Sequence, residues 1–212
     1  PASAGEDEGQ RLVGAVQERA VHLLGRPQAV DRREEELDAA AKRRFPNLGA
    51  LQGAIPGILE QLGFDASRAR WLAERIVVDP ARGSGHAMRA QRREDRAHLR
   101  TRVPAGGMNF QGYNVAMHEL GHNVEQVFSL NGIDFWPLSG VPNTAFTEAF
   151  AFTFQGQDLA VLGLGSPGEE AQHDEAIHSL WMTAEISGVS LLDMRIWNWL
   201  YAHPRATPAE TR

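Results

Sequence analysis

The sequence predicts a mainly α-helical protein with a small edge β-strand or sheet. Along most of the chain, apolar residues recur three and four residues apart, which is the spacing of an amphipathic helix. One short segment instead alternates apolar with polar residues, as a half-buried strand does. The chain has 212 residues, of which 42% are hydrophobic and 23% charged. This is the composition of an ordinary globular protein of one good-sized domain or two small ones.

Four helical segments are expected before residue 80. The second begins at Asp31, an N-capping residue type, and ends before Pro46. Pro56 interrupts the third segment, which therefore predicts two short helices or one kinked helix. The fourth segment is built around Trp71, Leu72 and Ile76. The four segments span residues 11–25, 31–44, 48–62 and 66–77.

A change of composition over residues 79–85, to Pro, Gly and Ser, predicts a loop and a boundary between two parts of the chain. We therefore expect a helical lobe in residues 1–80 and a second part in residues 81–212. Within the second part, residues 98–103 alternate apolar with polar side chains and predict a single edge strand, which ends before Gly106. The six arginines of residues 89–102 are expected to be solvated rather than to form an anion site.

Four more helices are expected after the strand, over residues 112–129, 144–160, 168–187 and 190–202. Near the end of the chain, Thr207 and Glu210 have the spacing of a capping box, and Pro208 stands at the first helical position between them. This is a helix start signal at the end of the sequence. It predicts that the chain is a fragment of a longer protein.

Composition excludes several classes of function. The longest apolar runs fall well short of the roughly 18 residues that a membrane span requires, so we expect no membrane span. The net charge of −6 argues against a nucleic-acid-binding protein, which would usually be basic. The absence of cysteine excludes disulfides and thiolate metal sites.

The segment HELGH, residues 118–122, carries the strongest chemical signal. On a helix, His118 and His122 lie one turn apart on one face, where both imidazoles can reach a single Zn²⁺. Glu119 is placed to approach a water beside the metal, and H-E-x-x-H is the pattern of two ligands plus a general base. The opposite stripe of this helix is apolar and is expected to face the core; it contains Tyr113, Ala116, Met117, Leu120, Val124, Val127 and Phe128.

A third protein ligand is needed to complete a catalytic zinc site. A histidine six residues after His122 is ruled out, because that residue is Phe128. Glu148 is the only acidic residue in the strongly apolar run 140–157, where a carboxylate would require a cation as partner. We therefore expect Glu148 to be the third ligand. Glu125 is expected to orient a ligand or touch substrate, and Asp134 stays open as a rival ligand.

HELGH followed by TEAFAF, with Glu148 26 residues after His122, resembles the gluzincin metallopeptidases. The likeness is greatest to the oligopeptidase (thimet oligopeptidase and oligoendopeptidase) family, and second to the carboxypeptidase Taq family. It covers roughly residues 79–160. It implies a zincin-like helical catalytic core, one zinc ion bound by His118, His122 and Glu148, and Glu119 as general base. By analogy, a peptide substrate would add to the 98–103 strand, and residues 85–86 would lie beside the cleft.

The sequence also departs from the oligopeptidase pattern. The family often has a further histidine where this chain has Glu125, and its members are much longer. Their transition-state-stabilising Tyr or His groups lie well beyond the metal glutamate, where this chain offers Tyr201 and His203 as stand-ins, although nothing in their local sequence singles them out. The prediction is a zinc metallopeptidase with residues 81–212 as its metal-binding catalytic core. The alternative is a non-hydrolytic peptide-binding or scaffold domain that retains a metal-stabilised helical core.

Overall fold

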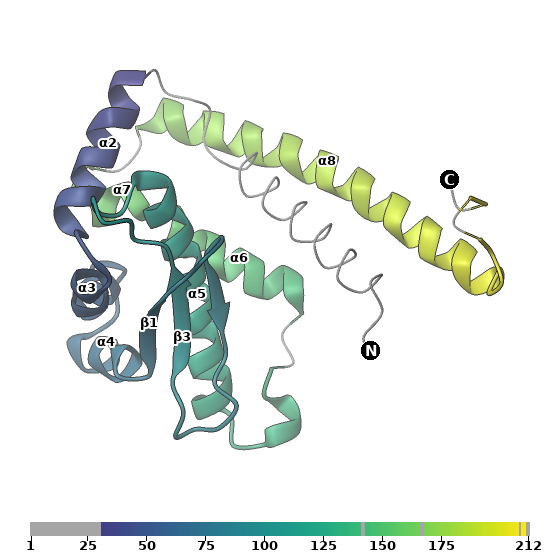
Figure 1. The fold of residues 1–212 in the computed structure, drawn as a ribbon, viewed down its shortest axis with the longest axis horizontal. Helices are drawn as coiled ribbons and strands as arrows, with labels where there is room; N and C mark the ends of the chain where they lie inside the picture. Colours follow the sequence, from purple (N-terminus) through teal and green to yellow (C-terminus); the bar gives the residue numbers. More distant parts are fainter. Residues whose placement is uncertain (1–30, 141–142, 166–167, 208, 211–212) are drawn as a thin grey trace. The chain divides into compact units, whose positions relative to one another are not determined.

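The computed structural model describes residues 31–140, 143–165, 168–207 and 209–210, so the helix expected over residues 11–25 lies outside the described residues. The described residues fall into two compact units, one that ends at residue 165 and one that begins at residue 168. The first unit contains short helices, a small sheet and the two helices that carry the candidate site (Figure 1). As the sequence predicts, the fold is mainly helical with a small sheet.

Three short helices open the first unit: α2 (Asp31–Arg44), α3 (Leu48–Gln61) and α4 (Ala66–Ala73). The bounds of α2 match the expected helix. The Asn47 side chain caps α3 by accepting a hydrogen bond from the backbone N–H of Ala50, 2.8 Å away. α3 is a single helix with Pro56 inside it, so the sequence does not form two short helices here.

The helix expected over residues 66–77 ends early, at Ala73, and this part of the prediction is wrong. Its last residues belong to strand β1 (Ile76–Pro80). The β-branched run Ile76–Val78 fits a pleated surface better than a helix, and β1 finds a parallel partner 21 residues further along the chain. Gln52 of α3 covers the other edge of β1 by donating to the carbonyl of Ile76 and accepting from the N–H of Val78.

The three strands form one mixed sheet in the order β1-β3-β2. β3 (Ala97–Thr101) pairs in parallel with β1 and antiparallel with the short strand β2 (His86–Met88). β3 is therefore the central strand, and the expectation that it forms the edge is wrong. Sequence alternation revealed the strand but could not show that both of its edges are paired. β1 and β2 are the two outer strands of the sheet.

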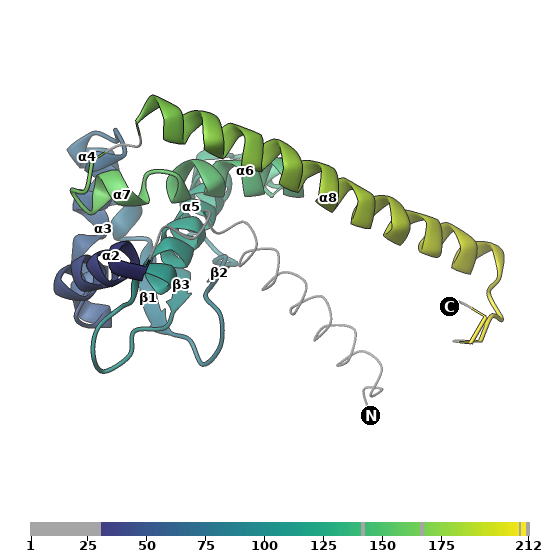
Figure 2. The ribbon, with the colours of Figure 1, turned by 90° about the horizontal axis from the view of Figure 1, so that it is seen from above.

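α5 (Phe110–Gly132) lies along one face of the sheet, and α6 (Thr144–Gln155) packs beside α5 (Figure 2). The 3-10 helix Trp136–Leu138 lies between them in the sequence. The helix expected over residues 144–160 is divided, because α6 ends at Gln155 and a short helix, α7 (Asp158–Val161), follows. The apolar stripe predicted for α5 is buried, with Phe128 only partly so.

One hydrophobic core joins the elements on both sides of residues 79–85. Phe45 stacks on Tyr113 with ring centroids 5.2 Å apart, so α5 packs on the chain between α2 and α3. The same core contains Ile55 and Leu72 before the loop and Leu99 and Val124 after it. The expected lobe boundary thus falls within one compact unit, because the N-terminal helices, the sheet and α5 bury their apolar faces together.

The second unit contains one long helix, α8 (Glu169–Ala202), where two helices were expected. Residues 188–189, at the expected break, are an ordinary part of this helix. After α8, Glu210 accepts hydrogen bonds from the N–H and hydroxyl of Thr207, both at 2.8 Å, so the acidic half of the predicted capping box forms. Among the described helices, none is long and apolar enough to cross a membrane.

Candidate metal centre

His118 and His122 project from the middle of α5, on the face that turns away from the apolar core stripe. Their positions one turn apart place the two imidazoles against each other, with ring centroids 4.7 Å apart and planes nearly perpendicular. The Nε2 atoms lie 3.1 Å from one another. His118 is buried and His122 partly buried, so both nitrogens meet in a sheltered position.

Glu148 comes to the same point from α6. Its Oε2 lies 3.2 Å from Nε2 of His118 and 3.5 Å from Nε2 of His122. Among the described residues, His118, His122 and Glu148 are the one group of His, Asp and Glu side chains whose ligand atoms converge closely enough to hold a metal ion. The structure therefore brings together the three residues that the sequence nominated as ligands.

The three ligand atoms form a triangle with edges of 3.1, 3.2 and 3.5 Å. Two ligands about 2.0–2.1 Å from a tetrahedral zinc ion would lie about 3.3 Å apart. The triangle thus has the size of one face of a zinc tetrahedron. Two imidazoles and one carboxylate also form a donor set that zinc uses in catalytic sites, where a fourth position stays open.

Gly121 allows the two site helices to approach closely. A Cβ atom at this position would lie 2.7 Å from Cα and 3.3 Å from the carbonyl oxygen of Ala151 in α6. No side chain fits in that space, so glycine is required for the observed packing. Gly121 lies directly before His122, and Ala151 lies three residues after Glu148. The close approach therefore sets the distance between the ligands on the two helices.

Glu148 is less buried than the apolar sequence around it predicts. Its side chain is 41% exposed, and α6 also exposes the rings of Phe146 and Phe152. Glu148 is therefore not buried, and the expectation that burial makes it require a cation is wrong. Its geometry supports a ligand role instead, because its carboxylate points at two imidazole nitrogens.

Contacts within the cluster shift the pKa values of Glu148 and His122. Hydrogen bonds from His118 and His122 lower the pKa of Glu148 to about 2. Burial opposes the charged form of His122, but its hydrogen bond to Glu148 and the nearby negative charges outweigh burial, so its pKa is raised. The cluster favours an ionised carboxylate, which is the form that binds a metal ion.

A chain of hydrogen bonds behind His118 fixes its orientation, and the sequence did not reveal it. Nδ1 of His118 lies 3.0 Å from Oε1 of Gln155. The amide of Gln155 donates to Asn114 at 2.6 Å, and Asn114 in turn donates to the buried carboxylate of Asp158 at 2.7 Å. An Nδ1–H bond to Gln155 leaves the Nε2 lone pair of His118 directed at the metal position. One signal was available: Asn114 lies four residues before His118 on the same helix.

Glu119 lies beside the entry to β2. A Cβ atom at Gly85 would lie 3.7 Å from Cγ of Glu119, and 3.0 Å from Val115 of the same helix. The expectation that residues 85–86 lie near the site is confirmed for Gly85. In the described part of the chain, the Glu119 carboxylate makes no hydrogen bond or ion pair. It is therefore available to accept a proton from a group bound at the site.

The rival ligands lie elsewhere. Asp134 pairs with Arg93 at 3.2 Å and is not part of the metal group. Tyr201 and His203, the candidates for transition-state stabilisation, belong to the other compact unit, where Nδ1 of His203 lies 2.8 Å from the carbonyl oxygen of Trp199. Glu125 lies one turn beyond His122, and its burial raises the pKa of its carboxyl group.

Comparisons of the chain with protein-family models, with curated proteins and with solved structures find no match. The resemblance to the oligopeptidase family thus stays a prediction from HELGH and TEAFAF. The functional proposal rests on the arrangement of four side chains: His118, Glu119, His122 and Glu148.

Proposed function

We propose that the protein hydrolyses peptide bonds with the help of one bound zinc ion. The observation that carries this proposal is the triangle formed by the Nε2 atoms of His118 and His122 and Oε2 of Glu148. Beside it lies the Glu119 carboxylate, which has no hydrogen bond or ion pair to any residue that the structure describes. A purely structural metal site closes around its ion with protein ligands. Three ligands plus an adjacent free carboxylate fit hydrolysis better.

Each residue has a distinct part in the proposed reaction. His118, His122 and Glu148 hold the ion, and a zinc ion bound there would supply Lewis-acid activation of water and of the scissile carbonyl. Glu119 takes the proton from the attacking water and later delivers it to the leaving amine. Gln155 acts through His118, because its hydrogen bond to Nδ1 holds the imidazole in the orientation that metal binding requires.

The sheet beside Glu119 supports an extended peptide as substrate. In the described residues β2 pairs with β3 alone, so its other edge offers free backbone N–H and C=O groups. An extended peptide can pair with such an edge. Gly85 leads into β2 and leaves no side chain between the strand and Glu119. A peptide on this edge would therefore pass close to the general base.

The test combines metal content with peptide cleavage. Protein purified without chelator is expected to contain about one zinc per chain by mass spectrometry, and Glu148→Ala is expected to lose most of it. Wild-type protein should cleave members of a mixed peptide library, and a chelator should abolish cleavage. Glu119→Gln should keep the zinc and lose cleavage, because the amide cannot accept the proton.

Two results would reject the proposal. Cleavage at the wild-type rate by zinc-loaded Glu119→Gln would exclude Glu119 as the base. Full zinc occupancy without cleavage of any library peptide would favour the alternative, a metal-stabilised scaffold or binding domain.

A further inference from the structure

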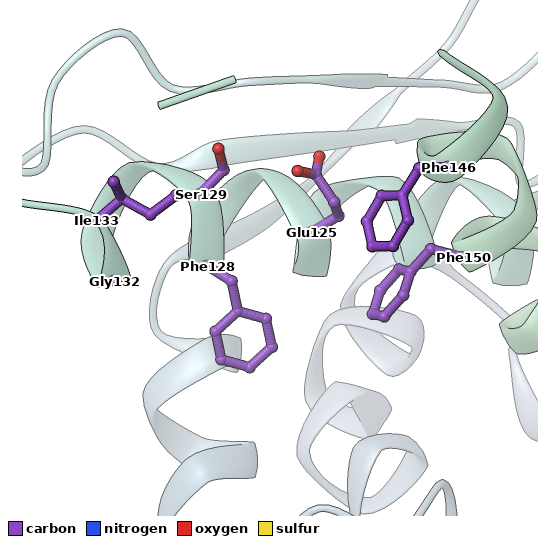
Figure 3. A pocket seen from close by; sticks show the side chains of 7 residues that line it. All are labelled: Glu125, Phe128, Ser129, Gly132, Ile133, Phe146 and Phe150. Carbon is purple, nitrogen blue, oxygen red and sulfur yellow. The ribbon is translucent and has the colours of Figure 1, made fainter. Parts of the chain in front are cut away.

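A pocket of about 390 Å³ lies beside the metal centre, between the C-terminal half of α5 and the start of α6. Its lining is aromatic and aliphatic except for one hydroxyl and one carboxylate (Figure 3). The carboxylate is that of Glu125. The lining residues are Glu125, Phe128, Ser129, Gly132, Ile133, Phe146 and Phe150.

The pocket is formed by the two helices that carry the candidate ligands, although none of the three ligands lines it. Glu125 lies three residues after His122, which is about 4.5 Å along the helix axis. Phe146 and Phe150 lie two residues on either side of Glu148, so their rings project from nearly the opposite side of α6. An extended peptide advances about 3.3 Å per residue. A substrate side chain in the pocket would therefore belong to a residue within about two positions of the cleaved bond.

The aromatic walls are held in place from behind. Phe128 stacks on Phe64 and on Trp71 of the core, with centroids 6.2 and 6.0 Å apart. Phe150 packs on Phe154 at 5.2 Å and on Phe146 at 6.3 Å. These contacts keep the walls in position before anything binds, so little ordering is needed when a ligand enters.

Glu125 is the unexplained member of the pocket. Its side chain is partly buried, yet no hydrogen bond or ion pair joins it to any part of the chain that the structure describes. Figure 3 shows its carboxylate beside the ring of Phe146. A carboxylate that is partly removed from water and lacks a partner destabilises the protein on its own. A cation placed between the carboxylate and the ring faces would remove that cost.

We propose that this pocket selects a lysine or arginine side chain of the peptide substrate. The apolar stem of such a side chain packs against Phe146 and Phe150, and its charged end reaches the Glu125 carboxylate. This inference rests on the proposed function, because it takes a peptide to be the molecule bound at the metal centre. It adds a specificity: cleavage next to a basic residue.

Among the described residues, Arg89 is the charged group from outside α5 that acts on Glu125. It follows β2, and its guanidinium lies against Gly140, where an added Cβ would meet Nη1 at 2.8 Å. Its positive charge acts on Glu125 electrostatically without a hydrogen bond between them. Arg89 therefore competes weakly with a substrate cation. Replacing Arg89 by glutamine should raise the affinity for a basic peptide, whereas Arg92→Gln, which breaks an ion pair with Asp95, should not.

The experiment measures binding and cleavage separately. Peptides carry either arginine or citrulline at one position, which is scanned along an otherwise constant sequence. Citrulline has nearly the shape of arginine without the charge. Binding is measured by calorimetry with zinc-loaded Glu119→Gln, in which bound peptide is not consumed. At one position within about two residues of the cleaved bond, arginine should bind about tenfold more tightly than citrulline.

Glu125→Gln in the same background should bind the two peptides equally at that position and keep its zinc. Equal binding of both peptides by the parent protein at every position overturns the inference. An arginine preference that persists in Glu125→Gln also overturns the inference. The same holds if no peptide binds. Arginine preference in binding without metal-dependent cleavage by the wild type would reject the proposed function alone. Cleavage without the preference would reject the pocket alone.

Discussion

The contact at Gly121 makes the distance between α5 and α6 directly testable by Gly121→Ala. In most helices this change is stabilising by about 1 kcal/mol, because alanine has the higher helix propensity. Here the new methyl group would lie 2.7 Å from Cα of Ala151, whereas an ordinary contact begins at 3.4 Å. The obstacle is backbone, so no side-chain rotation can relieve it. α6 must therefore move away by about 0.7 Å, the difference between these distances.

This displacement predicts losses of both stability and metal affinity. Overpacking of this kind costs about 1–3 kcal/mol, which exceeds the gain in helix propensity. Glu148 lies less than one turn before Ala151 and moves with it. A shift of about 0.7 Å is large against the roughly 0.2 Å to which metal–ligand distances are held. We expect zinc to bind at least tenfold more weakly to Gly121→Ala.

Gly53→Ala provides the matched control. Gly53 lies in α3 with open space around the position of a Cβ, so the same substitution should stabilise the protein by about 1 kcal/mol. The gain in helix propensity is the same in both variants, so urea unfolding of the metal-free proteins should give free energies of unfolding that differ by the overpacking cost, about 1–3 kcal/mol. Competition with a chelator gives the zinc affinities. If Gly121→Ala is as stable as Gly53→Ala and binds zinc like the wild type, the close contact does not set the ligand geometry.

Two further predictions concern the metal centre. Gln155→Met removes the acceptor for Nδ1–H of His118 and should weaken zinc binding 10- to 100-fold. The control is Gln157→Met: the Gln157 side chain is exposed and makes no capping hydrogen bond, so its loss should leave the zinc affinity unchanged. Equal zinc affinities of the two variants would exclude the orienting role of Gln155. Zinc at 100 times its dissociation constant should stabilise the folded protein by about 2.7 kcal/mol and raise the melting temperature by roughly 5–11 °C, and a chelator should reverse the rise. A similar zinc-dependent rise in Glu148→Ala would contradict the three-ligand site.

Helical periodicity identified elements whose partners are nearby in sequence. α2 has the bounds that its local sequence signals predict, and α5 covers the expected residues 112–129 with two or three more at each end. These signals act within one or two turns. Periodicity did not identify β1, whose short β-branched run also fits the end of a helix. Its identity depends on pairing with β3, which lies about 20 residues away and leaves no trace in the local pattern.

The ligands were predictable for the same reason. His118 and His122 are neighbours on any helix, and Glu119 follows from the motif they form. Glu148 was nominated because it is the only acidic residue in an apolar run. Its distance to the histidine nitrogen fits the predicted ligand role, but its side chain is more exposed than predicted. Glu148 does converge with the two histidines, although the buried environment for which it was nominated is not present in the folded chain.

The sequence by itself determined the helix that carries two of the proposed ligands and the proposed base, because the spacing of one helical turn brings those side chains together. Only the tertiary structure decided the distance from α5 to α6, the hydrogen-bond chain from His118 to Asp158, and the pocket that holds Glu125. Each joins residues that lie more than 15 positions apart. Their proximity depends on how two helices pack, and local sequence patterns report contacts only within one element.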